Sequence, residues 1–151
     1  MRPIKYIVVH CTATQPTATV EAIKKYWKEV RGWDKPGYHY LILRDGEIVQ
    51  LLEDGYVSYG AHGHNVNSIH IAYIGGVDKD GKPQDNRTLR QKNAMFFKLV
   101  ELSNYYKDAQ ILGHRDFPNV AKACPSFDVR KWMKDYKPDL SVDKEDLRNA
   151  A

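Results

Sequence analysis

The chain has 151 residues, enough for one domain with a hydrophobic core that needs no disulfide or structural metal. Hydrophobic residues make up 42% and charged residues 28%, a balance that excludes an intrinsically disordered chain. The net charge of +4 suits an anionic partner, but it is too small to identify one.

The N-terminal region lacks the pattern of an exported protein. Its first apolar stretch, Tyr6 to Val9, has only four residues, whereas a signal peptide needs roughly 7–15 followed by a small-residue cleavage site. No segment approaches the roughly 20 apolar residues of a membrane span. We therefore expect synthesis in the cytoplasm without a signal peptide, and no membrane association.

The first half of the chain predicts a strand, a helix and a hairpin. The segment from Ile4 to Cys11 is almost continuously apolar, as in a buried central strand. Thr19 is placed to cap a helix that carries apolar residues at helical spacing and ends at Gly32. Two strand-like runs, 38–44 and 47–52, flank Asp45-Gly46, a strong signal for a two-residue hairpin turn.

The second half alternates strands with helices. A strand over 68–74 is followed by a polar surface loop over 78–85. Thr88 and Gln91 form a capping-box pair that opens a helix through about Tyr106. We expect its buried stripe to comprise Leu89, Met95, Phe96, Leu99, Val100 and Leu102.

A short strand over 110–113 and a final helix over 127–136, with Ser126 and Asp128 at its start, complete the predicted elements. Together the elements predict an α/β fold: a single domain with a mixed central β-sheet flanked by helices. We assign residues 1–138 to this domain and residues 139–151 to a polar C-terminal tail.

Two of the six histidines, His10 and His114, directly follow short apolar strands. Ligand sites in open sheets gather beyond strand ends. With Cys124 they would make a site of two imidazoles and one thiolate, whose fourth tetrahedral position stays open as in catalytic zinc sites. The long spacings equally allow structural histidines and a core cysteine. Cys11 points to the opposite face of its strand from His10, so we expect it in the core.

Five blocks of sequence follow one another along the chain: His10-Cys-Thr-Ala-Thr, Pro36-Gly-Tyr-His-Tyr, Gly60-Ala-His-Gly-His-Asn-Val-Asn-Ser, Gly113-His-Arg-Asp and Lys122-Ala-Cys-Pro-Ser-Phe-Asp. In this order and spacing they resemble the type 2 N-acetylmuramoyl-L-alanine amidases, a family that includes phage lysozymes and peptidoglycan recognition proteins. The resemblance runs from about Ile4 to Trp132.

The resemblance implies a role for five of these residues. It makes His10, His114 and Cys124 the ligands of a catalytic Zn²⁺ ion. It also makes Tyr38 and Lys122 the groups that assist the reaction: Tyr38 by orienting water or passing a proton, Lys122 by stabilising an oxyanion. Outside the resemblance, a packed tyrosine and a solvated lysine would be the simpler interpretation.

The resemblance further implies that the loop 61–68 lines the substrate cleft, with His62, Asn65 and Asn67 as the substrate-binding residues. Uncharged donors and acceptors suit a substrate rich in amides and hydroxyls. The chain departs from the family pattern at His70, where relatives commonly carry Gly, and at His64, where smaller residues are usual. Both departures bear on the fit of the substrate, and we do not expect either histidine to bind the metal.

The resemblance thus predicts a zinc amidase that cuts peptidoglycan between N-acetylmuramic acid and L-alanine. Three alternatives stay open: a non-catalytic muramyl-peptide binding module, an amidase that also restrains an RNA polymerase, and a cysteine hydrolase using Cys124 and His114. We expect a monomer that binds peptidoglycan rather than nucleic acid. Without a signal peptide, it would be either an endolysin released by a holin or a cytoplasmic wall-recycling enzyme.

Overall fold

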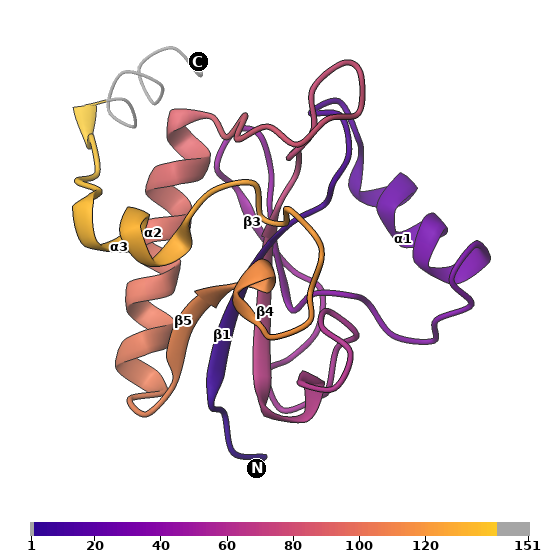
Figure 1. Ribbon diagram of the computed structural model, residues 1–151, viewed down its shortest axis with the longest axis horizontal. Helices are drawn as coiled ribbons and strands as arrows, with labels where there is room; N and C mark the ends of the chain where they lie inside the picture. Colours follow the sequence, from indigo (N-terminus) through magenta and orange to yellow (C-terminus); the bar gives the residue numbers. More distant parts are fainter. Residues whose placement is uncertain (1, 142–151) are drawn as a thin grey trace.

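The computed structural model describes residues 2–141, and a five-stranded sheet lies at its centre (Figure 1). The strands are β1 (Tyr6–Cys11), β2 (Tyr40–Ile42), β3 (Ile48–Gln50), β4 (Ser68–Tyr73) and β5 (Gln110–Gly113). They lie in the order β3-β2-β4-β1-β5, all parallel to their neighbours except β3, which pairs antiparallel with β2. The predicted α/β class and mixed central sheet are confirmed.

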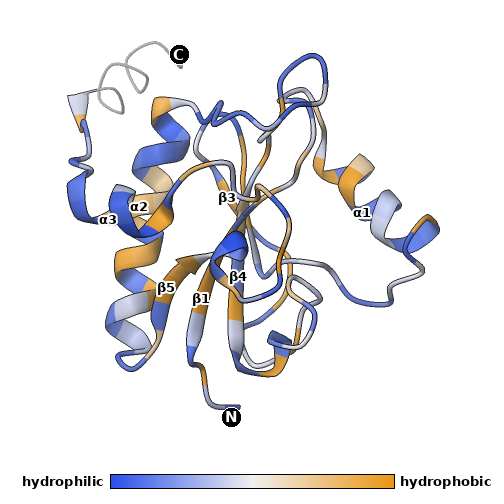
Figure 2. Ribbon diagram, viewed as in Figure 1, coloured by the Kyte–Doolittle hydropathy of each residue, from blue (hydrophilic) through white to orange (hydrophobic). Residues whose placement is uncertain are grey.

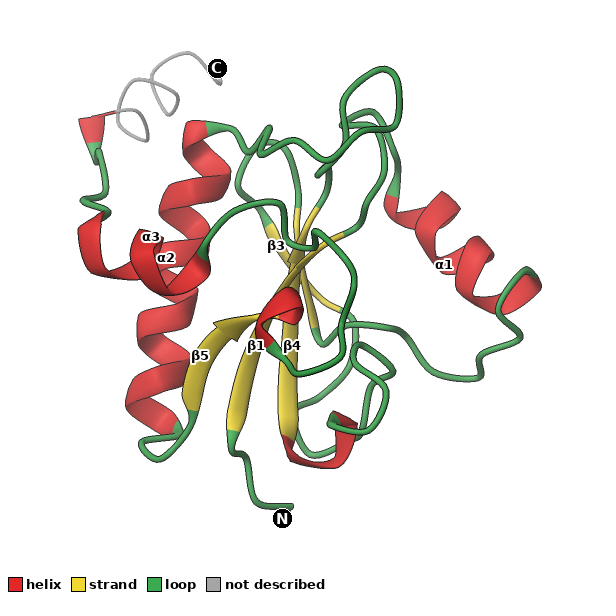
Figure 3. Cartoon of the chain, viewed as in Figure 1, coloured by secondary structure: helices red, strands yellow, loops and turns green. Residues whose placement is uncertain are grey.

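Within residues 2–141, the helices that flank the sheet are α1 (Val20–Glu29), α2 (Leu89–Tyr105) and α3 (Val129–Asp135) (Figure 3). Helices α2 and α3 lie together on one side, and α1 stands on the other (Figure 1). Two short 3₁₀ helices, Asn65–Asn67 and His114–Asp116, precede β4 and follow β5. No helix within residues 2–141 has the length and apolar content that crossing a membrane requires.

Side chains alternate between the two faces of the sheet, and the two faces differ in chemistry. On the face that α2 and α3 cover, Ile7 and Val9 of β1 join Ile69 and Ile71 of β4 in the main core cluster. Hydrophobic stretches recur along the neighbouring strands β5, β1 and β4 (Figure 2). We call this the helix face. The opposite face, which we call the histidine face, carries Val8 and His10 of β1 with His70 and Ala72 of β4.

The helix caps follow the sequence signals. The Thr19 side chain accepts a hydrogen bond from the Ala22 backbone N–H, and Thr88 and Gln91 form the complete capping box of α2. Asp128 caps α3 by accepting from the Lys131 N–H, so that helix begins two residues later than predicted. These caps satisfy amide groups that a helix start otherwise leaves without a partner.

The buried stripe of α2 is narrower than predicted. Met95, Leu99 and Leu102 are buried, but Leu89 is 38% exposed and Val100 is 36% exposed. Each residue turns the helix by about 100°, which places Leu89 and Val100 well away from the line through the three buried residues. The prediction that all six apolar residues share one buried stripe is therefore wrong.

The predicted hairpin forms, but its turn differs from the predicted one. The Leu43 N–H donates to Glu47 O, which leaves a three-residue loop instead of the predicted two-residue turn. Within this loop the Gly46 N–H donates to Leu43 O, and Gly46 has φ +90, a conformation that glycine adopts without strain. Three-residue loops that end in a glycine with positive φ are the next most common hairpin connections after two-residue turns.

Beyond α3 the chain returns to the helix face. The Asn93 side chain donates to Asp139 O at 2.8 Å and accepts from the Asp139 N–H at 3.2 Å. The start of the predicted polar tail is thus hydrogen-bonded to α2. Residues 142–151 of that tail lie outside the described part of the chain.

Candidate metal centre

The sheet brings His10 and His114 together at one edge. Val9 of β1 pairs with Gly113 of β5, so the next residue along each of these parallel strands is a histidine. The two imidazole rings lie 4.8 Å apart, centroid to centroid. The carboxyl ends of parallel neighbours share an edge, which is why residues about a hundred positions apart in the sequence come into contact.

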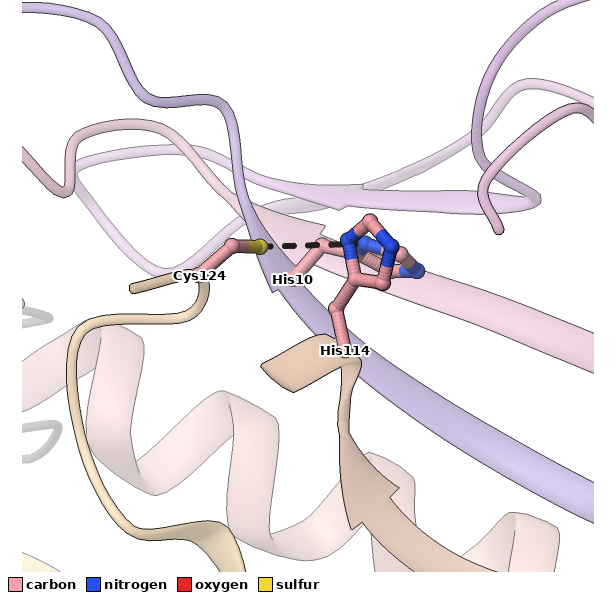
Figure 4. Close-up of side chains that lie close together, drawn as sticks. All are labelled: His10, His114 and Cys124. Atoms are coloured by element: carbon pink, nitrogen blue, oxygen red, sulfur yellow. Dashed lines mark hydrogen bonds between the residues drawn. The ribbon is translucent and has the colours of Figure 1, made fainter. Parts of the chain in front are cut away.

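Cys124 completes the group from the loop that follows β5. Its thiol points at the His10 ring, with Sγ 3.8 Å from Nδ1 of His10 (Figure 4). Two backbone hydrogen bonds hold this loop: Arg115 N–H donates to Cys124 O at 2.9 Å, and Cys11 N–H donates to Cys124 Sγ at 3.3 Å. The second bond would also stabilise negative charge on the sulfur.

The donor atoms of His10, His114 and Cys124 all lie within 4.8 Å of one another. Tetrahedral zinc, with bonds of about 2.0–2.1 Å to nitrogen and about 2.3 Å to sulfur, separates such donors by roughly 3.6 Å. The 3.8 Å between His10 Nδ1 and Cys124 Sγ is close to that separation. The three residues therefore fit a metal site, and their two imidazoles and one thiolate are a donor set that zinc favours.

Both histidines are held in the neutral form that a metal requires. Burial, with the nearby His70, His114 and Lys122, lowers the pKa of His10 well below its usual value. Burial and the Lys122 charge lower the pKa of His114 to about 4. A neutral imidazole keeps one nitrogen lone pair free for coordination.

The pKa of the Cys124 thiol shifts in the opposite direction from the pKa values of the two histidines. Contact with Cys11 and burial raise the pKa of Cys124 well above its usual value, so the metal-free site holds a protonated thiol. A metal ion that binds there would displace that proton. Cys11 itself is 3% exposed and packs in the core cluster of the helix face, which confirms its predicted place.

A cavity of about 470 Å³ opens over the three residues. Its walls come from β1 and the loop after it, from helix α1, and from the segments that carry Tyr38 and Lys122. Aromatic residues of and beyond α1, including Trp27 and Trp33, also line it. A space of this size holds an extended small ligand or a short polymer segment.

Tyr38 and Lys122 both line this cavity, as do the candidate ligands. The Tyr38 hydroxyl donates to Cys11 O at 3.2 Å, and its ring lies 5.1 Å from the His10 ring. Burial raises the pKa of Tyr38 well above its usual value, which keeps its proton in place as a hydrogen-bond donor. Lys122 is exposed at the rim, and its charge contributes to the lowered pKa values of His10 and His114.

The residues predicted to bind substrate take different positions. His62 is exposed, and the Asn67 side chain donates to Pro3 O at 2.9 Å, toward the N-terminal segment. Oδ1 of Asn65 accepts from the Ala61 N–H at 2.8 Å and lies 2.9 Å from Nε2 of His70. Tyr59 and Gly60, just before the loop 61–68, line the cavity, whereas these three residues are not among the described residues that line it. Their role in substrate binding stays a prediction.

No pattern in the sequence predicts the network of histidines that lies behind His10. His70 Nδ1 lies 2.8 Å from His10 Nε2, and the His70 ring stacks on that of His39 at an interplanar angle of 13°. Finding this network needs the strand register, since only the pairing of Val8 with His70 shows that His10 and His70 share a face. His64 instead stacks on Phe117, with 3.9 Å between ring centroids. The group of candidate metal ligands in the described chain consists of His10, His114 and Cys124.

Comparisons with known proteins give a consistent result. The chain is 37% identical over 129 residues to the endolysin of Klebsiella phage KP32, covering 85% of this chain and 84% of that protein. Among solved structures, it resembles the Ph2119 endolysin of a Thermus scotoductus bacteriophage, with a TM-score of 0.74 and 26% identity over 88% of this chain and 84% of the other. The N-acetylmuramoyl-L-alanine amidase LysC of Clostridium intestinale gives a TM-score of 0.74 at 25% identity, again over 88% and 84%.

The family described as N-acetylmuramoyl-L-alanine amidase matches residues 1–127, which include the first four sequence blocks, the fifth block as far as Phe127, and the three candidate ligands. Fold, site geometry and sequence agree: the chain belongs to the N-acetylmuramoyl-L-alanine amidase family.

Proposed function

We propose that this protein is a zinc-dependent amidase that hydrolyses the bond between N-acetylmuramic acid and L-alanine in bacterial peptidoglycan. One observation carries the proposal: His10, His114 and Cys124 converge at the floor of a cavity in a chain of the amidase family. Tyr38 and Lys122 line the same cavity, which favours an enzyme over a binding module that holds muramyl peptides without cutting them.

The chemistry needs a nucleophile at neutral pH, which zinc supplies when bound by acidifying a water molecule. The remaining work falls to the protein's own residues. Lys122 places a positive charge at the cavity rim, where it would stabilise the oxyanion that forms as the amide carbonyl is attacked. Tyr38 keeps its proton and faces His10, so it can orient the attacking water or pass a proton toward the leaving amine.

We further propose an endolysin role, in which the protein acts on the cell wall after release from the cell that makes it. The relatives at 37% identity are named endolysins, and they are matched over most of their own length. The wall polymer carries many amide and hydroxyl groups, and the aromatic side chains of Tyr26 and Trp33, which line the cavity, suit the apolar faces of such a substrate.

The direct test is to digest purified peptidoglycan with the protein, with and without a chelator, and to identify the new ends by mass spectrometry. We expect free lactyl carboxylates paired with new alanine amines, loss of cleavage with chelator, and recovery on addition of Zn²⁺. New reducing sugar ends would overturn the assigned bond. Activity that survives complete removal of the metal would instead indicate a cysteine hydrolase using Cys124 and His114.

The role of Lys122 is tested by Lys122→Ala, with Lys107→Ala as a matched control on an exposed lysine at the end of α2. Loss of a charge that stabilises an oxyanion typically costs about 10²–10³-fold in turnover. We expect a loss of that order in Lys122→Ala at unchanged zinc content, and no loss in Lys107→Ala. Normal turnover in Lys122→Ala would remove the residue from the proposed reaction.

A further inference from the structure

A chain of hydrogen bonds leads away from His10 on the side opposite the candidate metal. Nδ1 of His10 faces Cys124 Sγ, while its Nε2 lies 2.8 Å from Nδ1 of His70. Nε2 of His70 in turn lies 2.9 Å from Oδ1 of Asn65, which also accepts from the Ala61 N–H at 2.8 Å. The chain therefore ends on a backbone amide of the loop that precedes β4.

The protons along this chain can be assigned from its fixed end. A backbone N–H can only donate, so the Asn65 atom that faces Ala61 is its carbonyl oxygen. Because this oxygen only accepts, Nε2 of His70 must carry a proton and donate it to Asn65.

His70 is fully buried, and its ring nitrogens face one imidazole and one amide oxygen, so the ring is neutral and its Nδ1 is an acceptor. His10 must then donate from Nε2, which leaves the lone pair of its Nδ1 free and aimed at the site of the metal.

We propose that His70, held by Asn65, is a positioning residue that fixes the tautomer and ring orientation of His10 so that Nδ1 is presented to the metal. The proposal rests on the zinc site of the proposed function and adds to it two residues outside the set His10, His114 and Cys124. Metal-binding histidines commonly donate their second ring N–H to an acceptor, and that acceptor is usually a carboxylate, a carbonyl or water. Here it is a second imidazole.

The surroundings of His70 keep its ring in this orientation. A Cβ atom on Gly60 would lie 2.5 Å from Cγ and Nδ1 of His70, so the ring packs directly against the Gly60 backbone. The backbone N–H of His70 donates to Nδ1 of His39 at 3.0 Å, and the two rings lie nearly parallel. The close packing leaves the His70 ring little freedom to rotate. A residue that orients another side chain needs a fixed orientation of its own.

This assignment gives Asn65 a role different from the predicted one. Its carbonyl oxygen is engaged by two donors, Ala61 N–H and His70 Nε2. In this proposal Asn65 therefore acts on the chemistry through His70 and His10.

The first test measures the tautomer of His10 in the metal-free protein by ¹⁵N NMR of its ring nitrogens. We expect a protonated Nε2 and an unprotonated Nδ1. A proton on Nδ1 of His10 would overturn the proposal. This measurement requires neither bound metal nor activity.

The second test measures the affinity for Zn²⁺ by competition with a chromogenic chelator, and the visible spectrum of the Co²⁺-loaded protein. Loss of an outer partner of a metal-binding histidine typically weakens metal affinity about 10–100-fold. We expect this loss in His70→Leu, together with a changed Co²⁺ spectrum. We expect it also in Asn65→Leu but not in Asn65→Asp, whose carboxylate still accepts from His70.

Leu41→Ala is the matched control, because Leu41 is as deeply buried as His70 and lies on the same face of the sheet, beside Ala72, but has no ring nitrogen that could bond to His10. Urea unfolding of each variant separates lost stability from lost affinity. Zinc affinity lowered equally in Leu41→Ala and His70→Leu would reduce His70 to a core residue and refute the proposal. If His70→Leu does not fold, the Asn65 pair decides: equal affinities in Asn65→Leu and Asn65→Asp refute the proposal.

Failure of the proposed function would look different. In that case the parent protein would bind no Zn²⁺ at this site, so the substitution Cys124→Ser would not change the amount of Zn²⁺ bound. If only the positioning role fails, the parent protein binds Zn²⁺, and both His70→Leu and Asn65→Leu bind it with the same affinity as the parent.

Discussion

The two faces of the central sheet are built from the same strands but perform different tasks. On the helix face, Ile7, Val9, Ile69 and Ile71 pack against α2 and α3 in a continuous apolar core. On the histidine face, the same two strands carry His10 and His70, and the neighbouring segments add His39 and His114. Because strand side chains alternate, one short segment can supply both stability and chemistry.

The difference has an energetic basis. Each fully buried aliphatic side chain of the helix face stabilises the fold by about 1.5–3 kcal/mol. A buried imidazole stabilises it only if its polar nitrogens find partners, and His10, His39 and His70 satisfy theirs largely with one another and with the backbone. Substitutions on the two faces should therefore separate function from stability.

The largest effect is expected on the histidine face. Cys124→Ser removes a metal ligand. Loss of a hydrogen-bond partner of a metal ligand costs up to about 100-fold, so we expect turnover to fall by more than that in Cys124→Ser. Its metal-free form should unfold at nearly the temperature of the metal-free parent. Val100→Ala is the control, since Val100 lies on α2, away from the candidate ligands. Turnover and zinc content measured side by side check this, and equal losses in both variants would contradict the division between faces.

Next in size is a substitution on the helix face. Leu99 is fully buried under the sheet, and Leu99→Ala should lower the free energy of unfolding by about 2–5 kcal/mol. Turnover per folded, zinc-loaded molecule should stay unchanged. Val100→Ala, one residue along but 36% exposed, should change stability by less than about 0.5 kcal/mol. Urea unfolding of the three proteins measures this; similar losses in both variants would mean that α2 packs differently.

A smaller effect is expected from acid. Burial lowers the pKa of His10, His39 and His70 below the usual value, and that of His114 to about 4. Between the usual pKa near 6.5 and these lowered values, the unfolded chain binds more protons than the folded one, so stability rises with pH. The metal-free protein should thus be most stable above pH 6.5 and lose stability steadily toward pH 4. Urea midpoints at pH 7.5, 6 and 5 test this, and a flat profile would mean that the histidine face is open to water.

The smallest effect is expected at the start of α2. Thr88→Ala removes the cap of the helix and a hydrogen bond to Arg44 O, at a cost of about 1 kcal/mol. Thr88→Ser, which keeps the hydroxyl, should cost less than half as much. Both variants should retain full zinc affinity, because α2 lies on the helix face. A loss of zinc affinity in Thr88→Ala would show that the two faces are coupled.

Local sequence signals predicted most of the elements because their causes are local. The capping box of Thr88 and Gln91 and the apolar run before His10 depend on a few neighbouring residues, and both were confirmed. The errors arose where a local signal competes with packing. The stripe of α2 excludes Leu89 and Val100 because the sheet covers only one side of that helix. The Asp45-Gly46 turn gains a residue because Leu43 pairs with Glu47.

The sequence by itself determined the family and its candidate ligands, since five blocks in a fixed order identify the residues without any knowledge of the fold. Only the tertiary structure decided which residues form hydrogen bonds to the ligand His10. The register of β1 against β4 places His70 on the same face as His10, and a shift of one residue would have turned it into the core of the helix face. Strand register depends on contacts between distant segments, and for that reason no pattern along the chain could reveal the hydrogen-bond chain from His10 through His70 to Asn65.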